Sequence, residues 1–276
     1  MSYLRDLVYR RSAIVLNADK TYLIDSRLTP VVHEAGLTSI DELVGKIRHE
    51  DVGAQLVRRV IEAMTTNETL FFRDVHPFEA LKLQILPDLV KARAARRTLR
   101  IWCAAASTGQ EPYSIALTVR EHFPELASWD VKVIATDINA AVLERAREGT
   151  YRQLEVNRGL PIQMLCKYFD RNGTTYTLKP EIRNMVRFQE LNLLDAWGAI
   201  GPQDIVFIRN VLIYFDVDTK RQLLGRIRKL LEHDGFLVLG GAETTNNLDD
   251  NYAPVKIGSG VYYQIKTPDG NVGGVR

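Results

Sequence analysis

The sequence predicts an α/β fold in which a mainly parallel sheet is covered by helices on both faces. Strand-like runs alternate with amphipathic helices from about residue 98 onward, and one insert interrupts them. The preceding part of the chain carries helical patterns and no strand signal. Alternating strands and helices are typical of parallel sheets with both faces buried. We therefore expect a helical unit, then a sheet domain that contains a small β-rich insert.

The first part of the chain predicts a small helical domain. In TSIDELVGKIRHE, apolar residues recur at helical spacing, and Ser39 with Glu42 fits a capping box. The stretch EDVGAQLVRRVIEAM carries a second apolar stripe, which we expect to face a core. We expect residues 1–75 to form this helical domain and its linker, and residues 76–276 to form the second domain.

The second domain begins with the strand-like run LRIWC and continues with VKVIATD, DIVFIRN, GFLVLGG and GVYYQIKT. The clearest helix is TKRQLLGRIRKLLEHDG, whose leucines face one way and which Gly235 is expected to cap. Between the helix that ends near Gly149 and the next sheet strand, an insert at about 166–190 predicts a hairpin or three-stranded flap around Asn172 and Gly173.

Composition and charge exclude several classes of function. The chain has 276 residues with 46% hydrophobic and 25% charged residues, and its net charge of +2 does not favour nucleic acid or a membrane surface. No apolar run spans a bilayer, and the first residues lack the apolar core of a secretory signal. Cys103 and Cys166 lack metal-ligand spacing. We expect a cytoplasmic protein without a metal.

The stretch WCAAASTGQEPYS follows the first strand, where open sheets of this kind bind ligands. A dinucleotide site would need several glycines here, but the loop has only Gly109. Glu111 at the mouth of the next helix would repel phosphate and suits a ligand that carries an ammonium group. A purely local alternative is a capping box formed by Thr108 and Glu111.

A second acid, Asp137, ends the strand VKVIATD. A carboxylate at this place commonly holds both hydroxyls of a ribose. The alternative is an N-cap of the helix that follows. Together, Glu111 and Asp137 outline a nucleoside with an amine-bearing tail and no phosphates, a description that fits S-adenosylmethionine (SAM).

Five motifs in register give the chain a resemblance to a known family: TTNETLFFRD, WCAAASTGQEPYSIAL, ATDIN, LNLLD and IRNVLIYF. In this order and spacing they resemble the chemotaxis receptor glutamate O-methyltransferases, the CheR family. The resemblance covers nearly the whole chain. It implies a Rossmann-like SAM-dependent methyltransferase domain, an N-terminal all-helical domain and a small inserted β-subdomain, in an enzyme recruited to receptor arrays.

The resemblance also implies the roles of individual residues. Tyr214 matches a tyrosine near the transferred methyl group, and Arg73 matches a residue of the cofactor and acceptor cleft. A guanidinium at Arg73 can hold one oxygen of an acceptor carboxylate and leave the other aimed at the methyl. The alternative for Arg73 is a structural ion pair with Asp74 or Asp137. The positions matching cofactor contacts are Asn67, Thr69, Arg73, Glu111, Asp137, Asn192, Leu193, Asn210 and Val211.

The implied activity is methyl transfer from SAM to glutamate side chains on the acidic methylation helices of chemotaxis receptors. The products are glutamyl methyl esters and S-adenosylhomocysteine. A glutamate is already ionised at neutral pH, so the reaction needs no strong general base. We expect catalysis to rest mainly on positioning and electrostatics.

The sequence departs from the family pattern at GQEP and at LGGAETT. Some members of the family that the chain resembles use a glycine-rich loop of the β-subdomain to bind a short peptide at the receptor C-terminus. The corresponding flap loop here, DRNGTTYT, is short, so we expect an enzyme that works without a pentapeptide tether. Two other functions remain open: a SAM-dependent enzyme with a different acceptor, and a non-catalytic module that binds SAM and regulates receptors. A nicotinamide oxidoreductase is disfavoured because the glycine fingerprint is missing.

Overall fold

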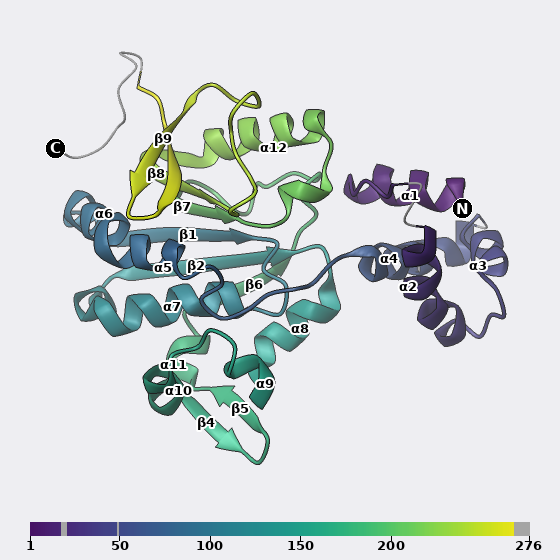
Figure 1. The fold of residues 1–276 in the computed structure, drawn as a ribbon, viewed down its shortest axis with the longest axis horizontal. Coiled ribbons are helices and arrows are strands. Elements are labelled where there is room, and N and C mark those ends of the chain that lie inside the picture. The colour runs from purple at the N-terminus through teal and green to yellow at the C-terminus, as the bar shows by residue number, and fades with distance from the viewer. Residues whose placement is uncertain (18–20, 49, 268–276) are drawn as a thin grey trace.

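A computed structural model describes residues 1–17, 21–48 and 50–267 of the chain. A helical domain lies beside a larger α/β domain, to which it is joined by an extended segment after α4 (Figure 1). A small β-subdomain projects from another side of the α/β domain (Figure 1). The expected fold class is therefore confirmed.

The helical domain has its own apolar core, separate from those of the sheet domain. The side chain of Ser39 accepts a hydrogen bond from the Glu42 N–H at 3.2 Å, as the capping motif predicts. The Glu42 carboxylate instead accepts from the Thr38 N–H at 2.8 Å, one residue earlier than expected. The helices are α1 (Ser2–Ser12), α2 (Thr21–Glu34), α3 (Ile40–Ile47) and α4 (Glu50–Met64).

Within the described residues, the main sheet has seven strands in the order β6-β2-β1-β7-β8-β10-β9. Its first five strands are parallel, and β10 runs antiparallel to both β8 and β9. A parallel core brings the carboxyl ends of its strands to one edge of the sheet. The strands are β1 (Thr98–Ala104), β2 (Asp130–Asp137), β6 (Val186–Glu190), β7 (Gln203–Ile208), β8 (Leu231–Leu239), β9 (Tyr252–Ile257) and β10 (Gly260–Ile265).

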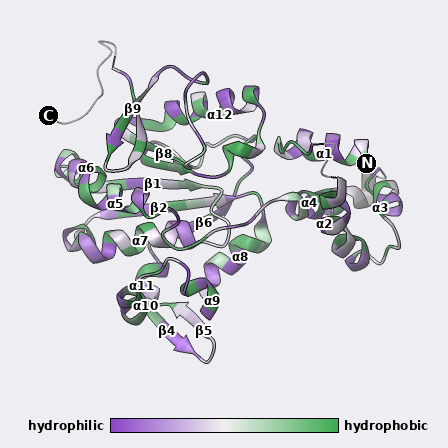
Figure 2. Cartoon of the chain, viewed as in Figure 1, coloured by the Kyte–Doolittle hydropathy of each residue, from purple (hydrophilic) through white to green (hydrophobic). Residues whose placement is uncertain are grey.

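Each face of the sheet packs against a different set of helices. Along β1, Leu99 and Ile101 face one core while Trp102 faces the other, as the period of two in a strand requires. Figure 2 shows mostly hydrophobic central strands and helices of mixed character. The first core includes α5 (His76–Ala80), η2 (Leu81–Ile85), α6 (Leu86–Arg93), α7 (Gln110–His122), η3 (Pro124–Ser128) and α8 (Ala140–Glu148); the second includes η4 (Leu212–Tyr214) and α12 (Val217–Leu230).

The hairpin expected around Asn172 and Gly173 is present, but the third strand of the flap is not where the sequence suggested. In the small sheet, the central strand β5 pairs with β4 and with Thr150–Arg152, which precedes the expected insert. The segment Val186–Glu190 instead joins the main sheet beside β2. The elements are β3 (Thr150–Arg152), α9 (Gln153–Val156), α10 (Ile162–Tyr168), β4 (Phe169–Asn172), β5 (Thr175–Leu178) and α11 (Pro180–Arg183).

The expected cap at Gly235 is wrong. The helix α12 ends at Leu230, and Gly235 lies inside β8. A Cβ at Gly235 would lie 2.7 Å from the Asp204 carbonyl oxygen, so glycine here permits close approach of the neighbouring strand and does not end a helix.

Candidate active site

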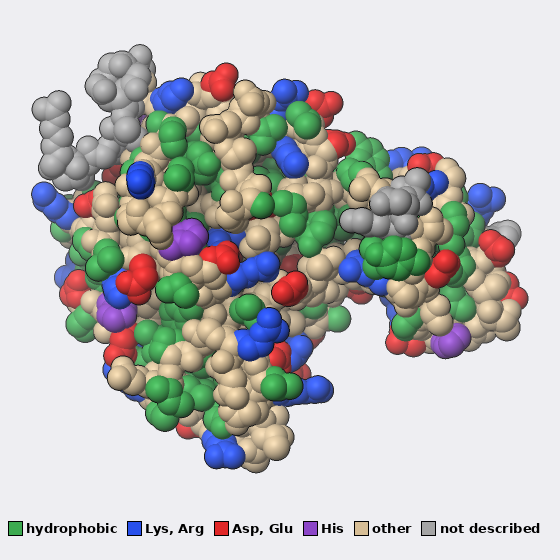
Figure 3. Space-filling view, viewed as in Figure 1, with side chains coloured by type: hydrophobic (Ala, Val, Ile, Leu, Met, Phe, Trp, Pro, Cys, Tyr) green, Lys and Arg blue, Asp and Glu red, His purple; other side chains and the backbone are tan. Residues whose placement is uncertain are grey.

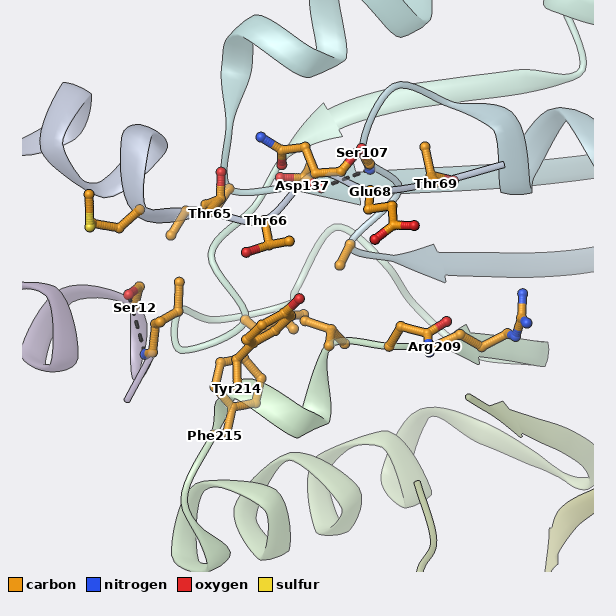
Figure 4. Close-up of a pocket in the computed structure, with 18 of the residues that line it drawn as sticks. Ser12, Thr65, Thr66, Glu68, Thr69, Ser107, Asp137, Arg209, Tyr214 and Phe215 are labelled. Carbon is orange, nitrogen blue, oxygen red and sulfur yellow. Dashed lines mark hydrogen bonds between the residues drawn. The ribbon is translucent and has the colours of Figure 1, made fainter. Parts of the chain in front are cut away.

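A cavity opens at the carboxyl ends of β1, β2 and β7, where it meets the helical domain and its linker. The empty space within its outline, which includes open solvent, is about 970 Å³. Figure 4 shows Asp137, Ser107 and Glu68 on one side of the cavity and Tyr214 and Arg209 on the other. All the residues that the sequence singled out line this cavity: Asn67, Thr69, Arg73, Glu111, Asp137, Asn192, Leu193, Asn210, Val211 and Tyr214.

The loop from β1 into α7 brings its backbone close to the cavity. Ala105 and Ser107 have φ values of 64° and 50°, which non-glycine residues seldom adopt. Gly109 has a φ of 93°, and a Cβ there would lie 3.0 Å from the Ala146 Cβ. The small side chains of the loop therefore serve a tightly turned backbone, as the sequence suggested.

Asp137 is buried at the end of β2, and backbone amides hold its carboxylate. Its Oδ2 accepts from the Ser107 N–H at 2.8 Å, and its Oδ1 accepts from the Asn139 N–H at 2.9 Å. Burial raises the pKa of the carboxyl, and the nearby backbone N–H groups of Asn139, Ser107 and Ile138 oppose that shift. The N-cap of α8 is Asn139, so the capping alternative for Asp137 is wrong. Each carboxylate oxygen keeps a lone pair for a further donor.

Glu111 is buried in the first turn of α7 and forms an ion pair with Arg209. The Arg209 Nη1 donates to Glu111 Oε2 at 2.8 Å, while Oε1 has no hydrogen-bond partner among the described residues. Burial raises the pKa of the Glu111 carboxyl, and the Arg209 guanidinium opposes that shift. The N-cap of α7 is Gly109, with no side-chain cap, so the capping-box alternative is wrong.

Arg209 is a buried residue of the cavity wall that the sequence reasoning missed. Its side chain is only 1% exposed, and its Nη2 donates to Asp74 Oδ2 at 2.6 Å and to the Arg73 carbonyl at 3.0 Å. One guanidinium thus ties Glu111 to the backbone that carries Arg73. A basic residue directly after the apolar strand QDIVFI was the available signal.

Arg73 lines the cavity without a carboxylate partner among the described residues. Its Nη1 donates to the Glu68 carbonyl at 3.0 Å. Asp74, the partner suggested by the structural alternative, pairs with Arg209 instead. The neighbouring backbone is unusual, because Phe72 and Asp74 have φ values of 51° and 69°. The Arg73 guanidinium therefore keeps donors available for a ligand.

Asn192 and Leu193 line the cavity and also hold neighbouring segments together. The Asn192 Nδ2 donates to the Arg11 carbonyl at 2.6 Å, so its amide ties the sheet domain to the end of α1. Leu193 is buried, and its carbonyl accepts from Arg226 Nη1 at 2.8 Å. Both residues therefore have structural contacts in addition to their place in the cavity wall.

The loop after β7 carries Asn210, Val211 and Tyr214. Tyr214 lies in η4, and its ring points into the cavity (Figure 4). Its carbonyl accepts from the Val15 N–H at 2.9 Å, a contact with the segment after α1. The helical domain thus reaches the cavity directly. Lining residues that the sequence analysis did not name include Ser12, Ile14, Thr66, Glu68, Ile138, Leu191 and Phe215.

Comparison with known protein families identifies the family of the chain that forms this cavity. Residues 67–261 match the family model described as "CheR methyltransferase, SAM binding domain", and residues 1–65 match "CheR methyltransferase, all-alpha domain". The chain belongs to the CheR methyltransferase family. It is accordingly a SAM-dependent methyltransferase of chemotaxis, as the motif resemblance predicted.

Relatives match the CheR chain over almost its whole length. A chemotaxis protein methyltransferase 1 of Pseudomonas aeruginosa is 43% identical over 95% of this chain and 96% of its own. One from Pseudomonas putida is 40% identical over the same shares, and one from Vibrio parahaemolyticus is 39% identical over 92% of each chain.

Two kinds of structural feature are absent from the described part of the chain. None of the helices in this part of the chain is long and apolar enough to cross a membrane. No cluster of three or more His, Cys, Asp or Glu side chains there is arranged to hold a metal ion.

Proposed function

We propose that this CheR-family enzyme transfers the methyl group of SAM to glutamate side chains on the helices of chemotaxis receptors, forming glutamyl methyl esters and S-adenosylhomocysteine. The observation that carries the proposal is the Arg73 guanidinium, which has no carboxylate partner among the described residues and lines the same cavity as Glu111 and Asp137. A cation with open donors beside a cofactor cavity suits an acceptor that is itself a carboxylate.

The residues of the cavity fit SAM. Asp137 retains lone pairs for ribose hydroxyls, and Glu111 Oε1 retains them for an ammonium. Arg209 is paired with Glu111 at the mouth of α7, so its guanidinium is not free to favour a phosphate there. Apolar side chains of Ile138, Leu193 and Phe215 can cover a base. When bound, SAM supplies an electrophilic methyl group.

The protein then has to position the acceptor carboxylate against the methyl group. Arg73 would hold one oxygen of the acceptor glutamate and direct the other, because a guanidinium presents several donors in a fixed plane. Tyr214 would border the site of transfer with its ring. No general base is needed, since the acceptor is ionised at neutral pH.

The acceptor can approach along a groove that shares Asn67, Glu68 and Thr69 with the cavity. Arg145 and Arg158 line it, and Arg158 has no carboxylate partner in the described part of the chain. Figure 3 shows basic side chains gathered near the middle of one face, among scattered acidic ones. This supports an acidic helix as the partner. We propose that the enzyme acts in the cytoplasm at receptor arrays.

The proposal predicts base-labile methyl esters on receptor fragments incubated with the protein and radiolabelled SAM. Because the hairpin loop between β4 and β5 is short, we expect equal labelling of fragments with and without their last five residues. Fragments whose methylation glutamates are replaced by alanine are the control. Labelling that survives this replacement, or no labelling at all, would contradict the glutamate acceptor; labelling that requires the last five residues would contradict the tether-independent route.

We expect Asp137→Ala to weaken SAM binding by about 10- to 100-fold, because hydrogen bonds to charged groups contribute about 1.5–3 kcal/mol each. Titration calorimetry with SAM measures the effect without an acceptor. Asp170→Ala, which removes an exposed carboxylate from β4, is the matched control. Unchanged affinity in Asp137→Ala would leave Asp137 with only its structural role of binding the Ser107 and Asn139 amides.

A further inference from the structure

Glu243 lies in the loop after β8, in a stretch that the sequence analysis treated only as a departure from the family pattern. Its carboxylate accepts four backbone hydrogen bonds. Oε2 accepts from the Gly240 N–H at 2.7 Å and the Asn210 N–H at 2.8 Å. Oε1 accepts from the Val211 N–H at 2.9 Å and the Ile213 N–H at 3.3 Å. Both oxygens are thus fully engaged with the backbone.

Three of these amides belong to the loop that forms one wall of the cavity. Asn210 and Val211 line the cavity, and Ile213 lies in η4 beside Tyr214. Asn210 has a φ of 57°, a left-handed conformation that asparagine tolerates better than most other non-glycine residues, and its N–H is held there by Glu243. A carboxylate at the start of a short helix also compensates the unpaired N–H groups there. Glu243 therefore holds the backbone that presents Asn210 and Tyr214.

Gly240 makes this arrangement possible. A Cβ at Gly240 would lie 2.8 Å from the Asn210 nitrogen and 2.8 Å from Glu243 Oε2. The loop after β8 can therefore approach the loop after β7 only with glycine at this position. The loops after β7 and β8, which are some 30 residues apart in the sequence, are held together where the Asn210 N–H donates to the Glu243 carboxylate.

We propose that Glu243 is a positioning residue of the methyltransferase, which fixes the segment from Asn210 to Tyr214 in the geometry that binds SAM and borders the acceptor. Glu243 is not itself part of the cavity wall, so it acts through the loop. The inference rests on the proposed function only where it concerns Tyr214, which borders the acceptor. Where it concerns Asn210 and Val211, it depends only on the binding of SAM.

The decisive variant is Glu243→Gln, because it keeps the size and shape of the side chain. Each carboxylate oxygen of Glu243 accepts from two backbone N–H groups. In either orientation of the glutamine amide, its NH2 group replaces one of these oxygens, and an NH2 group cannot accept the two hydrogen bonds. We expect SAM affinity to fall about tenfold and kcat/KM for receptor methylation to fall on the order of 10²-fold, since small misplacements in a site have effects of this size. A lower kcat at saturating SAM would show that Tyr214 as well as the cofactor wall has moved.

Glu42→Gln is the matched control, because Glu42 also accepts a backbone N–H but lies far from the cavity in the helical domain. Gly240→Ala is a second, independent variant that should displace the same loop from the opposite side. Calorimetric SAM affinity, methylation kinetics and the unfolding midpoint are measured for each protein.

The inference is supported if Glu243→Gln and Gly240→Ala lose SAM affinity and turnover while Glu42→Gln does not. It is overturned if Glu243→Gln keeps both within about twofold of wild type, or if only its unfolding midpoint changes. Should Glu243→Gln fail to fold, Gly240→Ala decides by the same criteria. Because SAM affinity is measured without an acceptor, a wild-type protein that binds SAM but labels no receptor would refute the proposed function and leave this inference to be judged by affinity.

Discussion

Replacing Arg73 by alanine is expected to reduce methyl transfer by about 10²- to 10³-fold, the usual cost of losing a donor aimed at reacting charge. SAM affinity should change far less, because Asp137 and Glu111 remain in place. Among the described residues, the Arg73 side chain donates only to the Glu68 carbonyl, so its truncation breaks no buried ion pair. Transfer of labelled methyl to receptor fragments, measured together with calorimetric SAM affinity, separates these two effects.

Two further variants sharpen the test of Arg73. Arg73→Lys keeps the charge but loses the planar fork, so we expect it to recover only part of the lost rate. Arg120→Ala removes an exposed arginine whose partner is Glu181, outside the cavity, and should leave transfer unchanged. A normal rate in Arg73→Ala, or a loss of rate that follows entirely from a loss of SAM affinity, would show that Arg73 does not hold the acceptor.

The sequence predicted the parts of the site that lie next to strand ends. Asp137 ends β2, and Glu111 lies in the first turn of the helix after β1. Parallel strands bring their carboxyl ends to one edge of the sheet, so the two acids had to lie at the same edge. The same reasoning applies to Asn210 after β7. Their convergence on one cavity needed only the order of strands and helices. The roles assigned to them remain predictions.

Residues whose role depends on distant contacts could not be predicted in this way. Arg209 meets Glu111 across 98 positions, and Glu243 meets Asn210 across 33. No local pattern records either contact. The edge strand β9 was not predicted for a different reason: it contains Pro254, and a proline in the sequence argues against a strand. The structure tolerates this proline because β9 lies at the edge of the sheet and has an unpaired side.

The helical domain is part of the site, which its sequence pattern alone did not reveal. Ser12 and Ile14 line the cavity, and the Val15 N–H bonds to the carbonyl of Tyr214. The Asn192 Nδ2 donates to the Arg11 carbonyl. Because α1 and the segment after it contact Asn192 and Tyr214, which both line the cavity, the position of the helical domain and the shape of the cavity are linked. Binding of SAM should therefore also restrain this domain.

We expect Asp204→Ala to destabilise the sheet domain by about 3–5 kcal/mol, the usual cost of breaking a buried ion pair. Asp204 is fully buried and accepts from Arg93 Nε at 2.7 Å, Arg96 Nη2 at 2.6 Å and the Arg100 N–H at 2.8 Å. Its removal leaves the largely buried Arg93 with Asp234 alone. Urea unfolding followed by tryptophan fluorescence reports on this domain, because Trp102, Trp129 and Trp197 all lie in it.

Asp130→Ala is the matched control, because Asp130 pairs with Arg100 at an exposed position near the same end of the sheet. An exposed pair contributes about 0.2–1 kcal/mol, so this variant should remain close to wild type. Asp204→Asn, which keeps an oxygen for the Arg100 N–H but loses the charge, should fall between the two. Equal stabilities of Asp204→Ala and Asp130→Ala would contradict this prediction. They would mean that the buried ion pairs around Arg93 stabilise the domain no more than a surface pair does. The apolar packing around β1 and β7 would then hold this end of the sheet together.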